Sequence, residues 1–296
     1  MTMGKTYEEY FGFSGTPFGR DVPVAELLKT RHWNELVERL KHVAKSREFG
    51  VFTGEPGTGK TTTLRRMATE LDKNRFRVLY VYDSDLTPRN FYVETLHQLG
   101  YSPKLSRGDT KRQLMKALEE IAQGSQIPVI VVDEAHLLSH EMLEEIRFLL
   151  NLEMDSKSSC SLILVGQAGL RSKLKLQIHQ AIDGRVDMRF HLEAMSSEET
   201  AIYIKRHLDR VKCPREIFTE SALKVIHDYS GGTPRKVNKV AQASLMAAAS
   251  QEKSLIDDHL VKEVIMNKRA GGLTRFICPG EFFLPDNFMG LFYRTL

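Results

Sequence analysis

The sequence predicts an α/β protein in which a parallel sheet flanked by helices is followed by a small all-helical domain. Short, continuously apolar strand patterns alternate with helical patterns up to about residue 194, as is typical of a parallel sheet that is covered on both faces. Beyond that point helical patterns follow one another without a strand, at 196–211, 219–229, 234–250 and 257–268. A chain of 296 residues is long enough for about two domains.

Composition and the length of the apolar runs indicate a globular protein and argue against a membrane-spanning or secreted one. Charged residues make up 27% and hydrophobic residues 42% of the chain, as in ordinary globular proteins. The longest apolar runs, such as 128–132, are too short to span a bilayer, and the N-terminus lacks the apolar core of a secretory signal. We therefore expect a cytoplasmic protein with no membrane insertion. Cys160, Cys213 and Cys278 are isolated and odd in number, which predicts reduced thiols and no zinc site.

The elements follow in order along the chain. An aromatic, turn-rich arm at 7–23 is expected to pack on the core, and 32–46 has the apolar stripe of an amphipathic helix. After an apolar run at 51–52, further strands are predicted at 77–83, 128–132, 161–165 and 188–192. Helices are predicted at 62–71, 88–100, 110–124 and 139–152. The tail at 270–296 breaks the helical pattern and predicts no structure.

The motif Gly54-x-x-x-x-Gly59-Lys60-Thr61 lies between a strand and a helix, which is the setting of a P-loop. Its glycines allow the backbone N–H groups to approach phosphate oxygens, and the helix N-terminus adds further donors. Lys60 supplies a charge for the β- and γ-phosphates, and the Thr61 hydroxyl is placed to ligate Mg²⁺. We therefore expect ATP and Mg²⁺ as ligands, with the nucleotide held by Gly54, Glu55, Pro56, Gly57, Thr58, Gly59, Lys60, Thr61 and Thr62.

Two adjacent carboxylates end the apolar strand at 128–132. Asp133 is expected to hold the Mg²⁺ shell together with Thr61, and Glu134 to orient and deprotonate the attacking water. Gln167 follows the strand at 161–165, where its amide can position water against the γ-phosphate. His136 and His140 are four residues apart, but with no third ligand nearby in the sequence we expect them to be structural or solvated.

Arginines are the side chains expected where charge on a transferred phosphoryl group must be neutralised. Arg185 precedes the last strand, and Arg235 lies in Gly-Thr-Pro-Arg at a helix start of the second domain. Arg189 is an alternative to Arg185. Spacing alone does not choose between them.

Taken together, these motifs resemble the AAA+ ATPases over roughly residues 7–268. The resemblance makes 54–61 the Walker A motif, 129–134 the Walker B motif, Gln167 sensor 1, Arg185 the arginine finger and Arg235 sensor 2. The stretches around Tyr10-Phe-Gly-Phe, Asp133-Glu-Ala-His and Leu164-Val-Gly-Gln are similar to the ExeA/GspA subgroup, which includes secretion and pilus-assembly ATPases and ATPases akin to the transposition regulators TnsC, TniB and MuB. The resemblance implies an arm and helix at 1–48, a nucleotide-binding domain at 49–194 and a helical lid at 195–269.

It also implies a homo-oligomer, a hexameric ring or a helical filament, in which one subunit's finger completes its neighbour's site. The first function we expect is an ATP-dependent regulator of transposition that assembles on duplex DNA and recruits a transposase. Basic residues in related rings line the DNA channel, and the candidates here are Lys104, Arg107, Lys111 and Arg112. The alternatives are a secretion or pilus-assembly ATPase that remodels an envelope complex, and a nucleotide-driven switch with little hydrolysis.

Overall fold

The computed structural model describes residues 6–19, 22, 30–83, 85–150, 158–213 and 215–269. The tail at 270–296, with Cys278, lies outside the described residues, as do 20–21 and 23 of the arm and the last two residues of the helix predicted at 139–152. Among the described helices, none is long and apolar enough to cross a bilayer.

The strands of the described residues form one parallel sheet, ordered β2-β3-β4-β1-β5. The strands are β1 (Phe49–Gly54), β2 (Phe76–Val81), β3 (Ile127–Val132), β4 (Ser161–Gly166) and β5 (Met188–Leu192). Their carboxyl ends lie at one edge, so the residues that follow β1, β3 and β4 meet there. The expected α/β class with a parallel sheet is confirmed.

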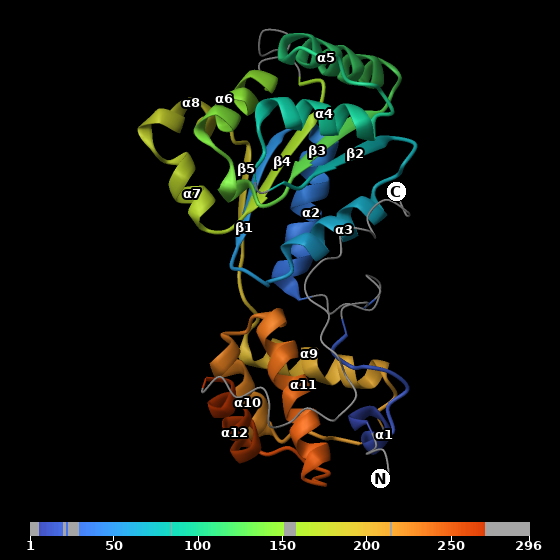
Figure 1. Ribbon diagram of the computed structural model, residues 1–296, viewed down its shortest axis with the longest axis vertical. Helices are drawn as coiled ribbons and strands as arrows, with labels where there is room; N and C mark the ends of the chain where they lie inside the picture. Colours follow the sequence, from blue (N-terminus) through green and yellow to red (C-terminus); the bar gives the residue numbers. More distant parts are fainter. Residues whose placement is uncertain are drawn as a thin grey trace.

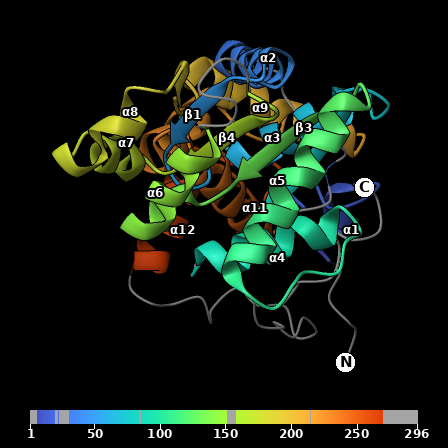
Figure 2. The same cartoon turned by 90° about the horizontal axis from the view of Figure 1, so that it is seen from above.

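Helices cover both faces of this sheet (Figure 2). On one face lie α2 (Arg31–Ser46) and α3 (Lys60–Glu70), packed on β3 through Val129 and Val131. On the other face, Ile130 and Val132 of the same strand belong to a second core with the remaining helices. These helices are α4 (Pro88–Gln98), α5 (Arg107–Gln123), α6 (His140–Leu149), α7 (Gly169–Leu174) and α8 (Gln180–Asp183). Both sides of β3 are therefore buried, which accounts for its continuously apolar sequence.

A separate helical domain follows the sheet (Figure 1). It consists of α9 (Ser197–Arg210), α10 (Glu220–Ser230), α11 (Pro234–Ser250) and α12 (Asp258–Arg269), packed around their own apolar core. The first of these helices begins with a capping box, in which Ser196 and Glu199 bond each other's backbone N–H groups. This is the all-helical part that the sequence predicts.

The aromatic arm lies against the helical domain and not against the sheet. Its short helix α1 (Tyr7–Phe11) contacts α11, and the Tyr7, Phe11 and Phe18 rings are buried in the helical core. The carbonyl oxygen of Pro17 accepts hydrogen bonds from His207 Nδ1 at 2.7 Å and Arg210 Nη2 at 2.8 Å. The N-terminal arm and the C-terminal helices therefore share one hydrophobic core. Their separation in the sequence gave no sign of this contact.

Short helices appear where the sequence predicted none. They include the 3₁₀ turns η2 (Ala135–Leu137) and η4 (Gln177–His179), and the helices α7 and α8. Helix α5 begins at Arg107, capped by Ser106, three residues before the start that the sequence predicts. Elements of three to six residues are too short to show a helical period, so tertiary contacts decide them.

Candidate active site

The P-loop connects β1, which lies between β4 and β5, to α3 at the carboxyl edge of the sheet. Gly57 and Gly59 have φ angles of +84° and +100°, in the left-handed region that suits glycine. Gly59 is the N-cap of α3 and carries no side chain to cap it. The first N–H groups of an 11-residue helix are therefore available to an anion. This arrangement fits a triphosphate.

Lys60, the first residue of α3, is buried against the P-loop. Its Nζ donates to the carbonyl oxygens of Gly54 at 2.8 Å and Glu55 at 3.1 Å. Burial lowers the pKa of Lys60, although the carboxylates of Glu134, Asp133 and Glu55 act in the opposite direction. A desolvated ammonium group with mainly carbonyl partners has much to gain from a phosphate oxygen.

Asp133 gathers the oxygen atoms that suit Mg²⁺. Its Oδ2 accepts from Thr61 Oγ1 at 2.8 Å and from Tyr80 OH at 2.9 Å, and its Oδ1 accepts from the Glu134 N–H at 2.8 Å. A buried carboxylate beside a threonine hydroxyl at a P-loop is the oxygen donor set that Mg²⁺ prefers in nucleotide sites. The two residues expected to share the metal are thus in direct contact.

Glu134 occupies a strained backbone position. Its φ of +51° is unusual for a residue with a side chain, and such strain is concentrated at functional sites. Its buried Oε2 makes no hydrogen bond to the described residues and lies 3.3 Å from His136 Nδ1. This carboxylate oxygen keeps its capacity to accept a proton from a water molecule.

The turn after β3 is held in place by Lys173 of α7. Its Nζ donates to the carbonyl oxygens of His136 at 2.7 Å and Leu138 at 2.9 Å. Gly166 allows the turn to approach β4, because a Cβ at Gly166 would lie 2.9 Å from the backbone N of His136. The strained turn is therefore clamped from two sides.

Gln167 follows β4, which lies between β1 and β3. Thr53 pairs with Gly166, and Val132 pairs with Leu164. This register brings Gln167 to the same edge as the P-loop and the two carboxylates, where the sequence predicted it. The half-buried Thr62 lies in the first turn of α3, and Thr58 Oγ1 donates to the Glu55 carbonyl at 2.8 Å within the loop. Glu55 and Pro56 are exposed at the loop tip.

The helical domain touches the P-loop through the start of α11. The Arg235 N–H donates to the Gly57 carbonyl at 3.3 Å. A Cβ on Gly57 would lie only 2.7 Å from Arg235 Cβ. The exposed side chain of Arg235 therefore starts beside the phosphate-binding loop, and a movement of the lid would move it.

Arg185 lies at the opposite edge of the sheet. The neighbouring Asp187 exchanges hydrogen bonds with Phe49 at the beginning of β1, donating at 2.9 Å to its carbonyl and accepting at 2.9 Å from its N–H. A six-residue strand extends about 20 Å, and Lys60 follows the other end of β1. The structure therefore does not bring Arg185 to the P-loop of its own chain.

The competing arginine is held by its own subunit. Arg189 Nη1 donates to Asp183 Oδ1 at 2.8 Å, and Nη2 donates to the Asp183 carbonyl at 2.6 Å. Arg185 makes a longer contact, 3.5 Å from Nη1 to the Arg147 carbonyl.

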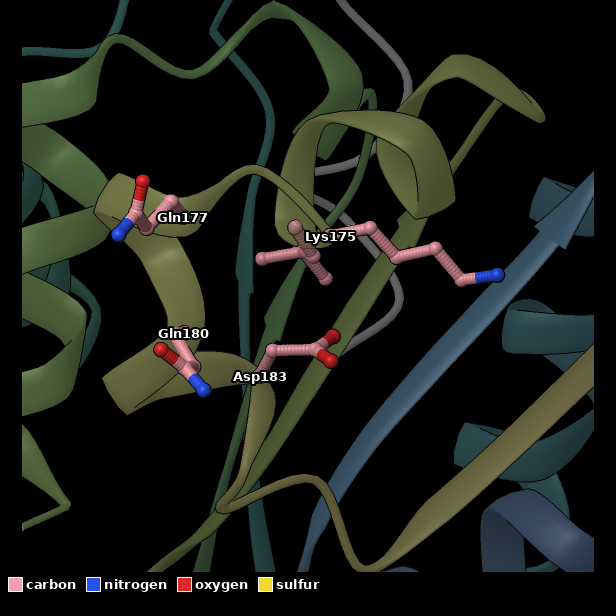
Figure 3. Close-up of a pocket in the computed structure, with 5 residues that line it drawn as sticks. Lys175, Gln177, Gln180 and Asp183 are labelled. Carbon is pink, nitrogen blue, oxygen red and sulfur yellow. The ribbon is translucent and has the colours of Figure 1, made fainter.

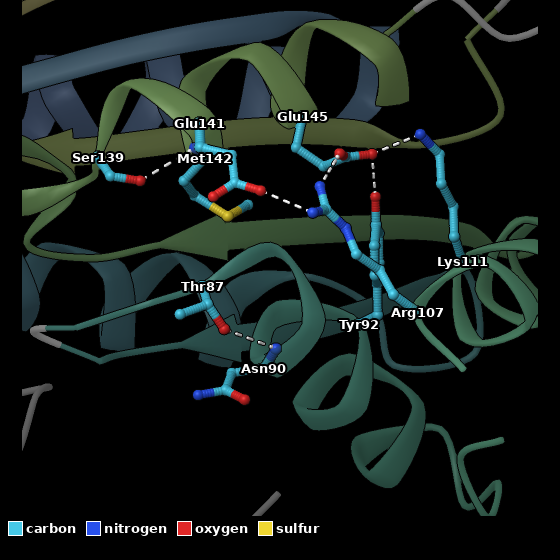
Figure 4. Close-up of polar contacts among 9 residues, drawn as sticks. All are labelled: Thr87, Asn90, Tyr92, Arg107, Lys111, Ser139, Glu141, Met142 and Glu145. Carbon is cyan, nitrogen blue, oxygen red and sulfur yellow. Dashed lines mark hydrogen bonds and ion pairs between the residues drawn. The ribbon is translucent and has the colours of Figure 1, made fainter. Parts of the chain in front are cut away.

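The four proposed DNA contacts lie around the start of α5, away from the P-loop. Arg107 donates to Glu141 at 2.6 Å and to Glu145 at 2.8 Å, and Lys111 also donates to Glu145 (Figure 4). Arg112 pairs with Asp109 at 2.6 Å, and Lys104 is exposed. Arg107 and Lys111 thus tie α5 to α6, and their contact with DNA stays a prediction.

A cavity of about 390 Å³ lies beside α7 and α8, away from the P-loop. It is lined by Leu174, Lys175, Gln177, Gln180 and Asp183, and Figure 3 shows the last three on the η4–α8 segment. Asp183 is the residue that holds Arg189. This hollow therefore lies on the part of the molecule that carries both finger candidates.

Sequence reasoning missed Tyr80, His136 and Lys173 as members of the site. One signal was available for Tyr80, since a phenol in a buried strand needs a hydrogen-bond partner. Burial and the Asp133 carboxylate raise the pKa of Tyr80, so it donates to Asp133 as a neutral phenol. No pattern in the sequence placed Lys173 at this turn, because it is 37 residues from the carbonyl that it binds.

Similarity to known proteins identifies the domain that carries this site. Residues 41–174 match the family model described as AAA domain. The chain contains an AAA domain. The expectation of an AAA+ ATPase is confirmed at the level of this domain.

Curated relatives extend the similarity beyond the AAA domain. General secretion pathway protein A of Aeromonas hydrophila is 30% identical over 248 residues, which cover 82% of this chain and 45% of that protein. The Replication factor C small subunit of Staphylothermus marinus is 26% identical over 215 residues, covering 71% and 56% respectively. The chain spans about half the length of these two relatives.

Solved structures share the fold. The Drosophila ORC structure bound to DNA has a TM-score of 0.65 at 18% identity, covering 88% of this chain and 65% of that one. Cdc6p from Pyrobaculum aerophilum has a TM-score of 0.63 at 18% identity, covering 85% and 70%. The AAA+ architecture of an AAA domain followed by a helical lid is thereby confirmed.

Proposed function

We propose that the AAA domain hydrolyses ATP with Mg²⁺ at the carboxyl edge of its sheet. Lys60 binds the β- and γ-phosphates together with the N–H groups of the P-loop. Thr61 and Asp133 hold Mg²⁺, which when bound neutralises charge on the phosphates. Glu134 takes a proton from the attacking water, and Gln167 positions that water.

The hydrogen bond between Thr61 and Asp133 carries this proposal. It joins the end of the P-loop to the end of β3 across 72 residues of sequence, at 2.8 Å. Glu134 follows directly, and its carboxylate lies near enough to Lys60 to act on the Lys60 pKa. A P-loop that only bound nucleotide would not need a second carboxylate there.

Two substitutions separate binding from chemistry. Lys60→Ala should abolish ATP binding, because it removes the cation of the phosphate site. Glu134→Gln should retain ATP binding while turnover falls by about two orders of magnitude or more. Fluorescent-nucleotide titration and phosphate release measure the two quantities. Normal turnover by Glu134→Gln would refute the assignment of Glu134 as the base.

We further propose that the active form is a homo-oligomer in which Arg185 serves a neighbouring subunit. Arg185 lies about a strand length from its own P-loop, so within one chain it has no path to the phosphates. An arginine supplied from a second subunit is a known way to neutralise charge in phosphoryl transfer. Arg235 would report the nucleotide state to the lid through its contact with Gly57.

For the process that this ATPase serves, we propose the remodelling of a protein complex in a secretion pathway. The support is the similarity to General secretion pathway protein A over 82% of this chain. This similarity favours the secretion alternative over the transposition regulator that the sequence had placed first. Recruitment of a transposase has no support beyond the original resemblance.

Binding to duplex DNA remains the second candidate, and one experiment separates it from the first. The full chain with Mg²⁺ and a slowly hydrolysed ATP analogue is titrated with duplex DNA at increasing salt. Tight binding that weakens steeply with salt would support a DNA-bound assembly. Oligomers that form equally well without DNA and show no DNA binding would support the secretion function.

A further inference from the structure

Three side chains with metal-ligating atoms come together between α6 and η4. They are His140 and Glu144 of α6 and His179 of η4, and one ligand atom of each lies within 4.8 Å of the other two. The two imidazole rings are tilted by 54°, with their centroids 4.9 Å apart. This cluster is separate from the Asp133 and Glu134 carboxylates.

The local structure explains why these three side chains lie close together. His140 and Glu144 are four residues apart on one helix, so they lie on the same face, one turn apart. His179 lies at the N-cap of α8, whose residues pack against α6. The sequence had paired His140 with His136 and found no third ligand. The fold pairs it instead with a residue about one turn later and with another 39 positions away.

His179 provides a second, independent observation. It is only 2% exposed, and its Nδ1 is buried without a hydrogen-bond partner among the described residues. A buried imidazole nitrogen with no hydrogen-bond partner costs free energy unless a ligand uses it.

Two cations near the cluster, Arg147 and Lys173, oppose a bound metal electrostatically, and each has partners that hold it in place. Arg147 is paired with the Glu144 carboxylate at 2.9 Å, which leaves the carboxylate with further lone pairs. The Lys173 ammonium is turned to the carbonyl oxygens of His136 and Leu138. His140 is exposed, so its ring can adjust.

We propose that His140, Glu144 and His179 bind a divalent first-row transition metal of the Zn²⁺ class. Two imidazole nitrogens and one carboxylate oxygen are a donor set that zinc accepts, with the fourth position left to water. Tetrahedral bonds of about 2.0–2.1 Å bring ligand atoms to within roughly 3.3 Å of each other. The side chains therefore draw together when the metal binds.

Such a site connects α6 to the segment that precedes Arg185 and holds Arg189 through Asp183. His179 is followed by α8, which ends at Asp183, the partner of Arg189, two residues before Arg185. A bound metal would restrain this segment relative to the sheet domain. The inference goes beyond the proposed ATPase chemistry and does not depend on it.

Metal binding is tested on the full chain with any affinity tag removed. Zn²⁺ is titrated calorimetrically, and Co²⁺ is used as a visible-spectrum probe of coordination. We expect one Zn²⁺ per chain and a cobalt spectrum without the near-ultraviolet charge-transfer band that thiolate ligands produce. Absence of saturable Zn²⁺ binding, or a thiolate band that assigns the metal to cysteines, would overturn the proposal.

Matched variants locate the metal. His140→Ala and Glu144→Gln should weaken Zn²⁺ binding by about tenfold or more, and His97→Ala, an exposed histidine of α4, should bind as the wild type does. Thermal unfolding checks that each variant folds, and Zn²⁺ should raise the Tm of the wild type and of His97→Ala but not of His140→Ala. Equal Zn²⁺ affinity in His140→Ala and the wild type contradicts the site.

Discussion

Glu145 shows how a single buried carboxylate organises its surroundings. It is 7% exposed and accepts hydrogen bonds from Tyr92, Arg107 and Lys111, which come from α4 and α5 (Figure 4). Burial alone would raise the pKa of Glu145, but the hydrogen bonds from Lys111, Tyr92 and Arg107 outweigh it and the pKa is lowered. The charged form is therefore the one that stabilises the fold.

We predict that Glu145→Gln lowers the free energy of unfolding by about 1–3 kcal/mol at pH 7, because Arg107 and Lys111 lose their shared anion. A folded-state pKa below the unfolded value means that this contribution is complete above about pH 4.3 and is lost as pH falls through the folded pKa. Urea unfolding of both proteins at pH 7 and at successively lower pH measures the difference.

The control for this prediction is Glu141→Gln. Glu141 is 62% exposed and contacts only Arg107 among the groups of this cluster, so its removal should change stability by less than about 1 kcal/mol. An equal decrease in the free energy of unfolding from the two substitutions would contradict the stabilising role of the Glu145 carboxylate. So would a decrease from Glu145→Gln that does not change with pH.

At the scale of elements, one close backbone contact joins the helical domain to the end of the sheet domain. The Met195 N–H donates to the Gly232 carbonyl at 3.0 Å, just before α9 begins. Gly232 has a φ of +66°, and a Cβ there would lie 2.0 Å from the Met195 carbonyl oxygen. Only glycine fits this crossing, which sets where α11 begins and thereby where Arg235 meets the P-loop.

We predict that Gly232→Ala costs roughly 2–5 kcal/mol of stability, from the left-handed conformation and the backbone clash together. Gly231→Ala is the matched control. Its φ is +57°, but a Cβ there meets nothing within 4 Å, so only the conformational cost of about 1–2 kcal/mol remains. Thermal and urea unfolding compare the two, and similar losses would show that the Met195 contact is unimportant.

The elements also differ in how well the sequence predicts them. Each strand is within about two residues of its predicted bounds, because a buried parallel strand needs a continuous apolar run. The helices of the lid are equally well placed, since Ser196, Thr219 and Pro234 begin them with clear start signals. The segment 169–183 lacks such signals, and packing against η2 and α6 decides its structure.

At the scale of the whole molecule, the proposed oligomer makes a prediction about mixtures. Glu134→Gln lacks the base but keeps Arg185, and Arg185→Ala lacks the finger but keeps its base. If the finger acts between subunits, each variant alone should be inactive, and mixing the two should restore part of the ATPase activity. The restored sites would combine an intact Glu134 from one subunit with an intact Arg185 from its neighbour.

Steady-state phosphate release over a range of mixing ratios measures this complementation. Mixing Arg189→Ala with Glu134→Gln gives the comparison for the second candidate. No recovery of activity at any mixing ratio would place the finger within one chain or remove it from the mechanism.

The sequence by itself determined the fold class, the P-loop, the two carboxylates after β3 and the position of Gln167. These follow from local rules, because a P-loop needs its glycines, lysine and threonine in one continuous stretch, and parallel strands place their following residues at one edge. Tertiary structure alone decided which residues meet across long separations. It brought Tyr80 to Asp133, Lys173 to the turn at His136, Arg235 to Gly57 and His179 to His140. Such contacts depend on how whole elements pack, which no local pattern of residues records.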